Sequence, residues 1–144
     1  MVLAKKITTC LLFDGQAGEA ARHYTSIFPG SKITSESPLV TVFQIEGQEF
    51  MALNGPKSAF TWAVSLLVSC ETQEEIDGYW EKLSKGGEEQ PCGWVKDKYG
   101  LSWQIVPAIF SALLEDKDRA KAGRAMQAMM RMKKIGRASC RERV

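Results

Sequence analysis

The 144-residue sequence has little of what catalytic, disulfide-bonded or membrane proteins need. It contains one histidine, His23, and four cysteines without a C-x-x-C pair. Widely spaced cysteines favour buried reduced thiols over a disulfide framework. No stretch approaches the roughly 20 apolar residues of a membrane span, and residues 1–12 lack the cleavage pattern of a signal peptide. We therefore expect a cytoplasmic protein with no membrane partner.

The sequence also lacks the usual signatures of covalent catalysis and of cofactor binding. His23 precedes Tyr24 in a predicted helix, so we interpret it as a surface or packing residue rather than a catalytic base. No glycine-rich turn follows an early strand in the way that seats a nucleotide-like cofactor. No cofactor is expected.

The net charge of +2 conceals an asymmetry between the two ends of the chain. Residues 1–116 hold 9 basic and 15 acidic side chains, whereas residues 117–144 hold 10 and 2. An acidic body argues against a nucleic-acid partner. The basic end leaves nucleic-acid binding open as a minor alternative, although charge on a helix is usually a solvated face.

Hydrophobic periodicity predicts the same order of elements twice. In the first half, a strand is expected at 6–13, a helix at 16–28, and strands at 32–36, 39–45 and 48–53. In the second half, we expect a strand at 62–69, a helix at 73–83, and strands at 93–96 and 101–106.

Sliding the first half by 56 positions brings the two halves into register. Tyr24 then falls on Trp80, Gly30 on Gly86, and Thr9 on Ser65. Two similar units are expected to bury their apolar faces against each other, so we predict a single domain, 1–135. Its modules would span about 5–55 and 61–107.

Two helices are predicted to complete the domain, at 108–114 and 117–134. The second carries an apolar stripe that is typical of core or dimer packing: Ala122, Ala125, Met126, Met129 and Met130. Residues 136–144 have no apolar period, so we predict disorder there and leave open that this segment is not native.

Four segments resemble the PhnB-like family, also labelled demethylubiquinone methyltransferase-like, of the vicinal-oxygen-chelate superfamily. They are ITTCLLFDGQAGEAARHYTSIFPGSKI, FMALNG, LLVSCETQEEIDGYWEKLSKGG and CGWVKDKYGLSWQIVP. The resemblance implies an α+β fold of paired βαβββ modules with curved mixed sheets, as in glyoxalase and bleomycin-resistance proteins, plus C-terminal helices. It also implies a homodimer.

Enzymes of that superfamily hold a divalent metal at positions that fall here on Thr9, Ser65 and Gln104. Two hydroxyls and an amide supply no negative charge to offset desolvation of the ion. We therefore expect no metal.

The remaining expectation is a pocket for a small organic ligand. Strand alternation places Gln104 on the same face as Ser102 and Val106, and the resemblance turns that face toward a cavity. Ordinary core packing stays open as the alternative for each aromatic residue. The candidate pocket residues are Thr9, Phe43, Met51, Trp62, Ser65, Trp94, Lys98 and Gln104.

Three functions follow from these observations. The first is a small-molecule-binding protein that works without a metal. The second is an enzyme of the superfamily, either a metal-dependent lyase or dioxygenase, or a methyltransferase as the family label suggests. The third is nucleic-acid binding through the basic end.

Overall fold

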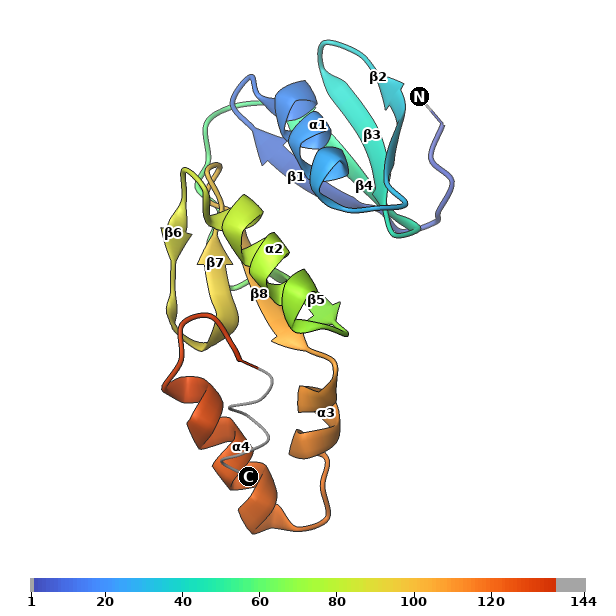
Figure 1. Cartoon of the computed structure of the whole chain (residues 1–144). Helices are drawn as coiled ribbons and strands as arrows, with labels where there is room; N and C mark the ends of the chain where they lie inside the picture. Colours follow the sequence, from blue (N-terminus) through green and yellow to red (C-terminus); the bar gives the residue numbers. More distant parts are fainter. Residues whose placement is uncertain (1, 137–144) are drawn as a thin grey trace. The chain divides into compact units, whose positions relative to one another are not determined.

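A computed structural model describes residues 2–136 (Figure 1). The chain divides into two compact units, Met1–Ala59 and Phe60–Val144, and each is described here by itself. The expectations for residues 137–144, including their disorder, lie outside the described residues.

The first unit has one helix against a four-stranded mixed sheet (Figure 1). Its sheet order is β1-β4-β3-β2, in which β1 and β4 run parallel and the other pairs are antiparallel. The elements are β1 (Thr9–Phe13), α1 (Ala17–Ile27), β2 (Lys32–Glu36), β3 (Val40–Ile45) and β4 (Gln48–Asn54).

The core of this unit lies between α1 and the sheet. Tyr24 of α1 stacks on Phe43 at 6.2 Å between ring centroids, and Phe43 stacks on Phe50 at 5.4 Å. Asn54 at the end of β4 accepts a 2.8 Å hydrogen bond from the backbone N–H of Ala17. This bond satisfies one of the free donors at the helix start, because Gln16 makes no side-chain cap.

The second unit repeats the topology of the first. Its sheet order is β5-β8-β7-β6, again with the first pair parallel. The elements are β5 (Ser65–Cys70), α2 (Gln73–Ser84), β6 (Glu88–Glu89), the 3-10 turn η1 (Pro91–Gly93), β7 (Trp94–Lys96), β8 (Ser102–Pro107), α3 (Ile109–Leu114) and α4 (Arg119–Met130). The predicted α+β fold of two βαβββ modules with C-terminal helices is therefore confirmed.

Strand β6 was not predicted from the sequence. It consists of two glutamates, and glutamate is depleted in strands. Pairing with β7 decides its conformation.

Gly87, next to β6, shows how closely the chain passes over the β7–β8 turn. A Cβ atom at this position would lie 2.0 Å from the backbone oxygen of Lys96 and 2.7 Å from the carbonyl carbon of Asp97. Only glycine fits without a backbone shift, because real Cβ contacts do not come so close.

The burial pattern of the two sheets corrects the alignment of the two halves that the sequence predicted. The loop from β1 to α1 is one residue longer than the loop from β5 to α2, so the strands correspond at an offset of 57 rather than 56. Thr9 shares its side of the sheet with Leu11 and Phe13, which are buried beneath α1. The counterpart of Ser65 is therefore Thr8, and Thr9 faces the helix.

The C-terminal helices add a second cluster of buried side chains to the second unit. Val106, Phe110, Ala125, Met129 and Ile135 pack together. Of the predicted apolar stripe, Ala122, Ala125 and Met129 are buried, together with Ala128. Met126 and Met130 are 41% and 62% exposed, so core packing does not account for them.

Helix α4 also ends four residues earlier than predicted. After Met130, the backbone carbonyls of Met132 and Lys133 accept 2.7 Å hydrogen bonds from the N–H groups of Cys92 and Gly93. These bonds hold the chain beside η1, and Ile135 lies in the core.

Cys10, Cys70 and Cys92 are free thiols in the described part of the chain, as expected for reduced cysteines. Burial was expected for all of them. Only Cys70 is buried, whereas Cys92 is half-buried and Cys10 is exposed. Among residues 2–136, no helix has the length and apolar character to cross a membrane.

Candidate functional site

The candidate site lies on the face of the second sheet that points away from α2. The helix-side face is packed, because Trp103 and Ile105 of β8 are buried with Ile76 and Leu83 of α2. Strand alternation therefore directs Ser102 and Gln104 to the opposite face. The residues opposite them on β7 are Lys96 and Trp94, and these two side chains share that face.

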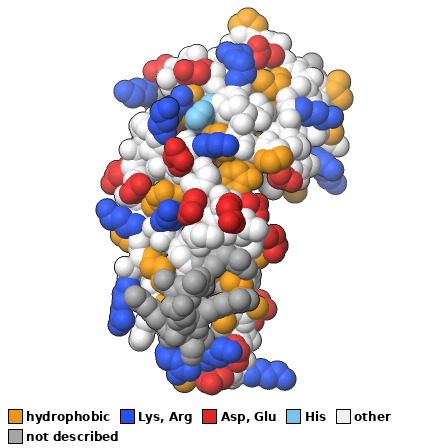
Figure 2. Space-filling view, viewed as in Figure 1, with side chains coloured by type: hydrophobic (Ala, Val, Ile, Leu, Met, Phe, Trp, Pro, Cys, Tyr) orange, Lys and Arg blue, Asp and Glu red, His pale blue; other side chains and the backbone are white. Residues whose placement is uncertain are grey.

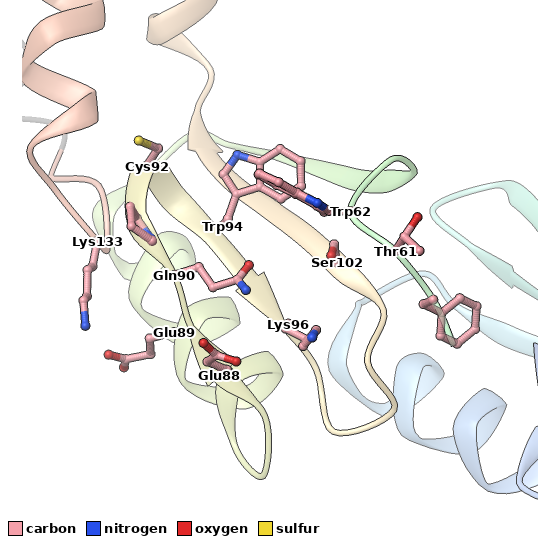
Figure 3. A pocket seen from close by; sticks show the side chains of 12 residues that line it. Thr61, Trp62, Glu88, Glu89, Gln90, Cys92, Trp94, Lys96, Ser102 and Lys133 are labelled. Atoms are coloured by element: carbon pink, nitrogen blue, oxygen red, sulfur yellow. The ribbon is translucent and has the colours of Figure 1, made fainter. Parts of the chain in front are cut away.

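An open pocket of about 950 Å³ occupies this face, and all of its lining residues belong to the second unit. Figure 3 shows the side chains of Trp94, Lys96 and Ser102 on the sheet, with Trp62 and Thr61 on the segment that leads into β5. The lining residues are Phe60, Thr61, Trp62, Glu88, Glu89, Gln90, Pro91, Cys92, Trp94, Lys96, Ser102 and Lys133.

Two tryptophans form the aromatic part of the pocket. Trp62 and Trp94 meet edge to face, with ring centroids 6.2 Å apart and an angle of 77° between the planes. Trp62 is 76% exposed. Trp62 is therefore not part of the core, and its ring forms one wall of the open pocket.

The acidic groups of the pocket are not equivalent. The Glu89 carboxylate accepts a 2.9 Å hydrogen bond from the indole nitrogen of Trp80 on α2. Glu89 therefore has a structural partner within the protein. Glu88 lies at the rim of the pocket. It is the register partner on β6 of Lys96 on β7.

Ser65 and Gln104 form a hydrogen-bonded pair on the same open face. Gln104 Nε2 donates to Ser65 Oγ at 3.0 Å across β5 and β8. Two residues that the sequence assigned to one site are thus brought together. Gln104 also lies directly opposite Trp94 on the neighbouring strand, so the pair borders the pocket.

These two residues do not fit a divalent cation. The pair is uncharged, and the amide nitrogen already uses the serine oxygen as its acceptor. Divalent ions need carboxylate, imidazole or thiolate ligands to offset their desolvation. In the described residues, no group of three or more His, Cys, Asp and Glu side chains is placed to hold a metal ion.

The other predicted site residues lie elsewhere. Lys98 stands over the ring of Tyr99, with Nζ 5.4 Å from its centroid, and does not line the pocket. Phe43 is fully buried in the core of the first unit, as the alternative of ordinary core packing describes. Met51 lies on the helix-free face of its own sheet, opposite Cys10, whereas Thr9 faces α1.

His23 lies on α1 and is half-buried, with its ring 5.7 Å from that of the adjacent Tyr24.

Of the residues that line the pocket, the sequence predicted only Trp62 and Trp94 as site residues. Alternation along the last strand placed Ser102 on this face, whereas Lys96 and Gln90 were among the residues missed. Alternation along β7 could have identified Lys96, since it lies two residues after Trp94 on the same strand. Gln90 lies in the irregular segment between β6 and β7, where no periodicity reports the direction of a side chain.

The hairpin that carries Lys96 is held by a buried carboxylate. Asp97, at the end of β7, accepts hydrogen bonds from the backbone N–H groups of Tyr99 and Leu101 and from the indole nitrogen of Trp103. These bonds fix the β7–β8 turn, and with it the positions of Trp94 and Lys96.

Comparison with known proteins places the chain in one family. The sequence profile described as 3-demethylubiquinone-9 3-methyltransferase matches residues 5–106. The structure of a PhnB protein from Bacillus cereus is 39% identical and aligns over 72% of this chain and 100% of its own, with a TM-score of 0.66. No curated protein has a matching sequence.

More distant structures share the fold alone. The fosfomycin resistance protein FosX from Listeria monocytogenes is 15% identical, and the match covers 72% of this chain and 90% of that one with a TM-score of 0.54. A possible glyoxalase from Bacillus cereus is 14% identical, over 70% of this chain and 98% of that one, with a TM-score of 0.51.

Proposed function

Since this chain belongs to the PhnB-like, 3-demethylubiquinone-9 3-methyltransferase family of the vicinal-oxygen-chelate superfamily, we propose that it binds a small organic molecule without a metal ion. The observation that carries the proposal is the open pocket beside the Ser65–Gln104 pair. Its size of about 950 Å³ suits a small ligand, as does its mixture of aromatic walls and a few polar groups.

Two features of the pocket support binding rather than metal-assisted catalysis. The exposed ring of Trp62 and the half-buried ring of Trp94 offer apolar area that a planar molecule could cover. The polar pair at the border supplies a hydrogen-bonding group, the Gln104 amide oxygen, without a charge that would hold an ion.

Isothermal titration calorimetry with a panel of planar aromatic compounds tests this proposal. We expect at least one compound to bind, and we expect Trp62→Ala to weaken its binding by about tenfold, since an aromatic contact of this kind is worth roughly 1–2 kcal/mol. Val64→Ala is the matched control, because Val64 is 63% exposed on the same segment and does not line the pocket.

Dialysis against EDTA should leave this affinity unchanged. If the purified protein instead contained stoichiometric divalent metal by elemental analysis, and lost ligand binding on its removal, the metal-dependent lyase or dioxygenase would be the better assignment. Methyl transfer to a phenolic acceptor, measured with a labelled methyl donor, would favour the activity in the family's name.

We further propose that the protein is a cytoplasmic homodimer that does not bind nucleic acid. The free thiols at Cys10, Cys70 and Cys92 support a reducing compartment. Figure 2 shows basic and acidic side chains interspersed over one face of the described chain, which does not resemble the continuous basic surface of a nucleic-acid-binding protein. Light scattering after gel filtration tests whether the protein is a dimer. Retention on a DNA column tests whether it binds nucleic acid.

A further inference from the structure

The ligand class follows from the charges that face the pocket. Lys96 extends from β7 on the same face as Trp94, and Lys133 approaches from the segment after α4 (Figure 3). Ion pairs in the described residues involve Arg22 with Glu36, Lys121 with Asp116, and Lys134 with Asp77. Neither pocket lysine has a carboxylate partner among residues 2–136, so both ammonium groups are available to a ligand.

The acidic side chains at the pocket do not cancel this positive charge. Glu89 is engaged by the indole nitrogen of Trp80 at 2.9 Å. Glu88 lies opposite Lys96 on the neighbouring strand, but no ion pair joins the two side chains in the described residues. Ser102, by contrast, is 1% exposed and lies opposite Lys96 on the neighbouring strand, so the two side chains leave the sheet on the same face and both line the pocket.

We propose that this pocket selects aromatic carboxylates. The aromatic ring would lie against Trp62 and Trp94, and the carboxylate would accept hydrogen bonds from Lys96 Nζ and Ser102 Oγ. Ring and charge are matched because the tryptophan and the lysine occupy alternate positions of one strand, and so project from the same face. This inference rests on the proposed small-molecule binding and names the chemical class that the site takes.

Calorimetric titration with benzoate, benzamide and benzylamine tests the proposal on the full chain. The three probes share a ring and differ in charge. We expect benzoate to bind about tenfold more tightly than benzamide, because a hydrogen bond from the lysine to a carboxylate is stronger than one to a neutral amide oxygen. The advantage should shrink at high salt, where exposed charges are screened.

Lys96→Met should abolish the preference for benzoate, so that benzoate and benzamide bind with the same affinity. Lys98→Met is the matched control, because Lys98 lies two residues away and its ammonium group stands over Tyr99 instead. Since both lysines are exposed, neither change should impair folding.

The possible results distinguish the preference for carboxylates from small-molecule binding itself. If the three probes bind equally, or if benzylamine binds best, the carboxylate preference is overturned while small-molecule binding stands. If no planar aromatic compound binds at all, the proposed function fails as well.

Discussion

Asp97 accepts a 2.9 Å hydrogen bond from the indole Nε1 of Trp103, and both side chains are only 2% exposed. The other carboxylate oxygen accepts from the backbone N–H groups of Tyr99 and Leu101, at 2.9 and 3.0 Å. One buried side chain thus connects the turn between β7 and β8 to the core beneath α2.

We expect Asp97→Ala to lower the free energy of unfolding by about 3 kcal/mol, because it leaves buried donors unsatisfied at roughly 1–3 kcal/mol each. Urea denaturation measures the change. Asp14→Ala is the control, since Asp14 is exposed and a surface substitution usually stays within about 0.5 kcal/mol. Equal midpoints for the two variants would show that the carboxylate is dispensable.

Glu49 should make the stability of the first unit depend on pH. Its carboxylate accepts hydrogen bonds from Thr8 Oγ1 at 2.5 Å and from the N–H groups of Ala4 and Lys5 at 2.7 and 3.2 Å. The Thr8 bond, followed by the Ala4 bond, lowers the pKa of Glu49 below its ordinary value of 4.5.

A lowered pKa in the folded state means that the carboxylate stabilises the fold above the unfolded pKa, and that this contribution disappears as the pH falls through the folded pKa. We expect the melting temperature of the parent protein to exceed that of Glu49→Gln at pH 7, with the gap closing below pH 4.5. The exposed Glu81→Gln provides the comparison. A gap that stays constant down to pH 3 would contradict the assignment.

Cys70 should be inert toward thiol reagents while the protein is folded. Burial, followed by the nearby charges of Glu75 and Glu71, raises the pKa of its thiol to about 12 from an ordinary 9.0, and the thiolate is the reactive form. We expect iodoacetamide at pH 8 to modify the exposed Cys10 first and Cys70 only in urea, as followed by peptide mass spectrometry. Equal labelling of the two in the folded protein would refute this.

Two glycines of the second unit should respond in opposite directions to the same substitution. Gly87→Ala places a methyl group 2.0 Å from the Lys96 oxygen, and we expect it to destabilise the protein by at least about 2 kcal/mol through overpacking. Gly78 lies inside α2 with nothing within 4 Å of an added Cβ. Gly78→Ala should stabilise by roughly 0.5–1 kcal/mol through helix propensity.

Urea denaturation of the two alanine variants measures both effects. The prediction fails if Gly87→Ala is as stable as Gly78→Ala.

Much of the fold could be predicted because its signals are local. The three- and four-residue spacing of Ala20, Tyr24 and Ile27 was enough to locate α1 and its buried side. The same spacing of Ile76, Trp80 and Leu83 located α2. The pair β6 and β7 was harder, since Glu88 and Glu89 carry no strand propensity and only pairing makes them a strand.

The candidate site was predicted in part for the same reason. Of the eight residues predicted to line a pocket, Trp62 and Trp94 do so. Ser65 and Gln104 form a hydrogen-bonded pair beside it, on the same face of the sheet as Trp94. Thr9 was misassigned because one extra residue in the β1–α1 loop shifts the strand against the helix, and a shift of one residue moves every side chain to the other face.

By itself, the sequence determined the repeated order of strands and helices, the buried side of each main helix and the absence of a membrane-spanning run. These properties depend on neighbours within a few positions along the chain. The tertiary structure decided which strands pair, where α4 ends, and which lysines face the pocket. Those outcomes depend on contacts between residues far apart in sequence, such as Gln104 with Ser65 and Cys92 with Met132, which no local pattern reports.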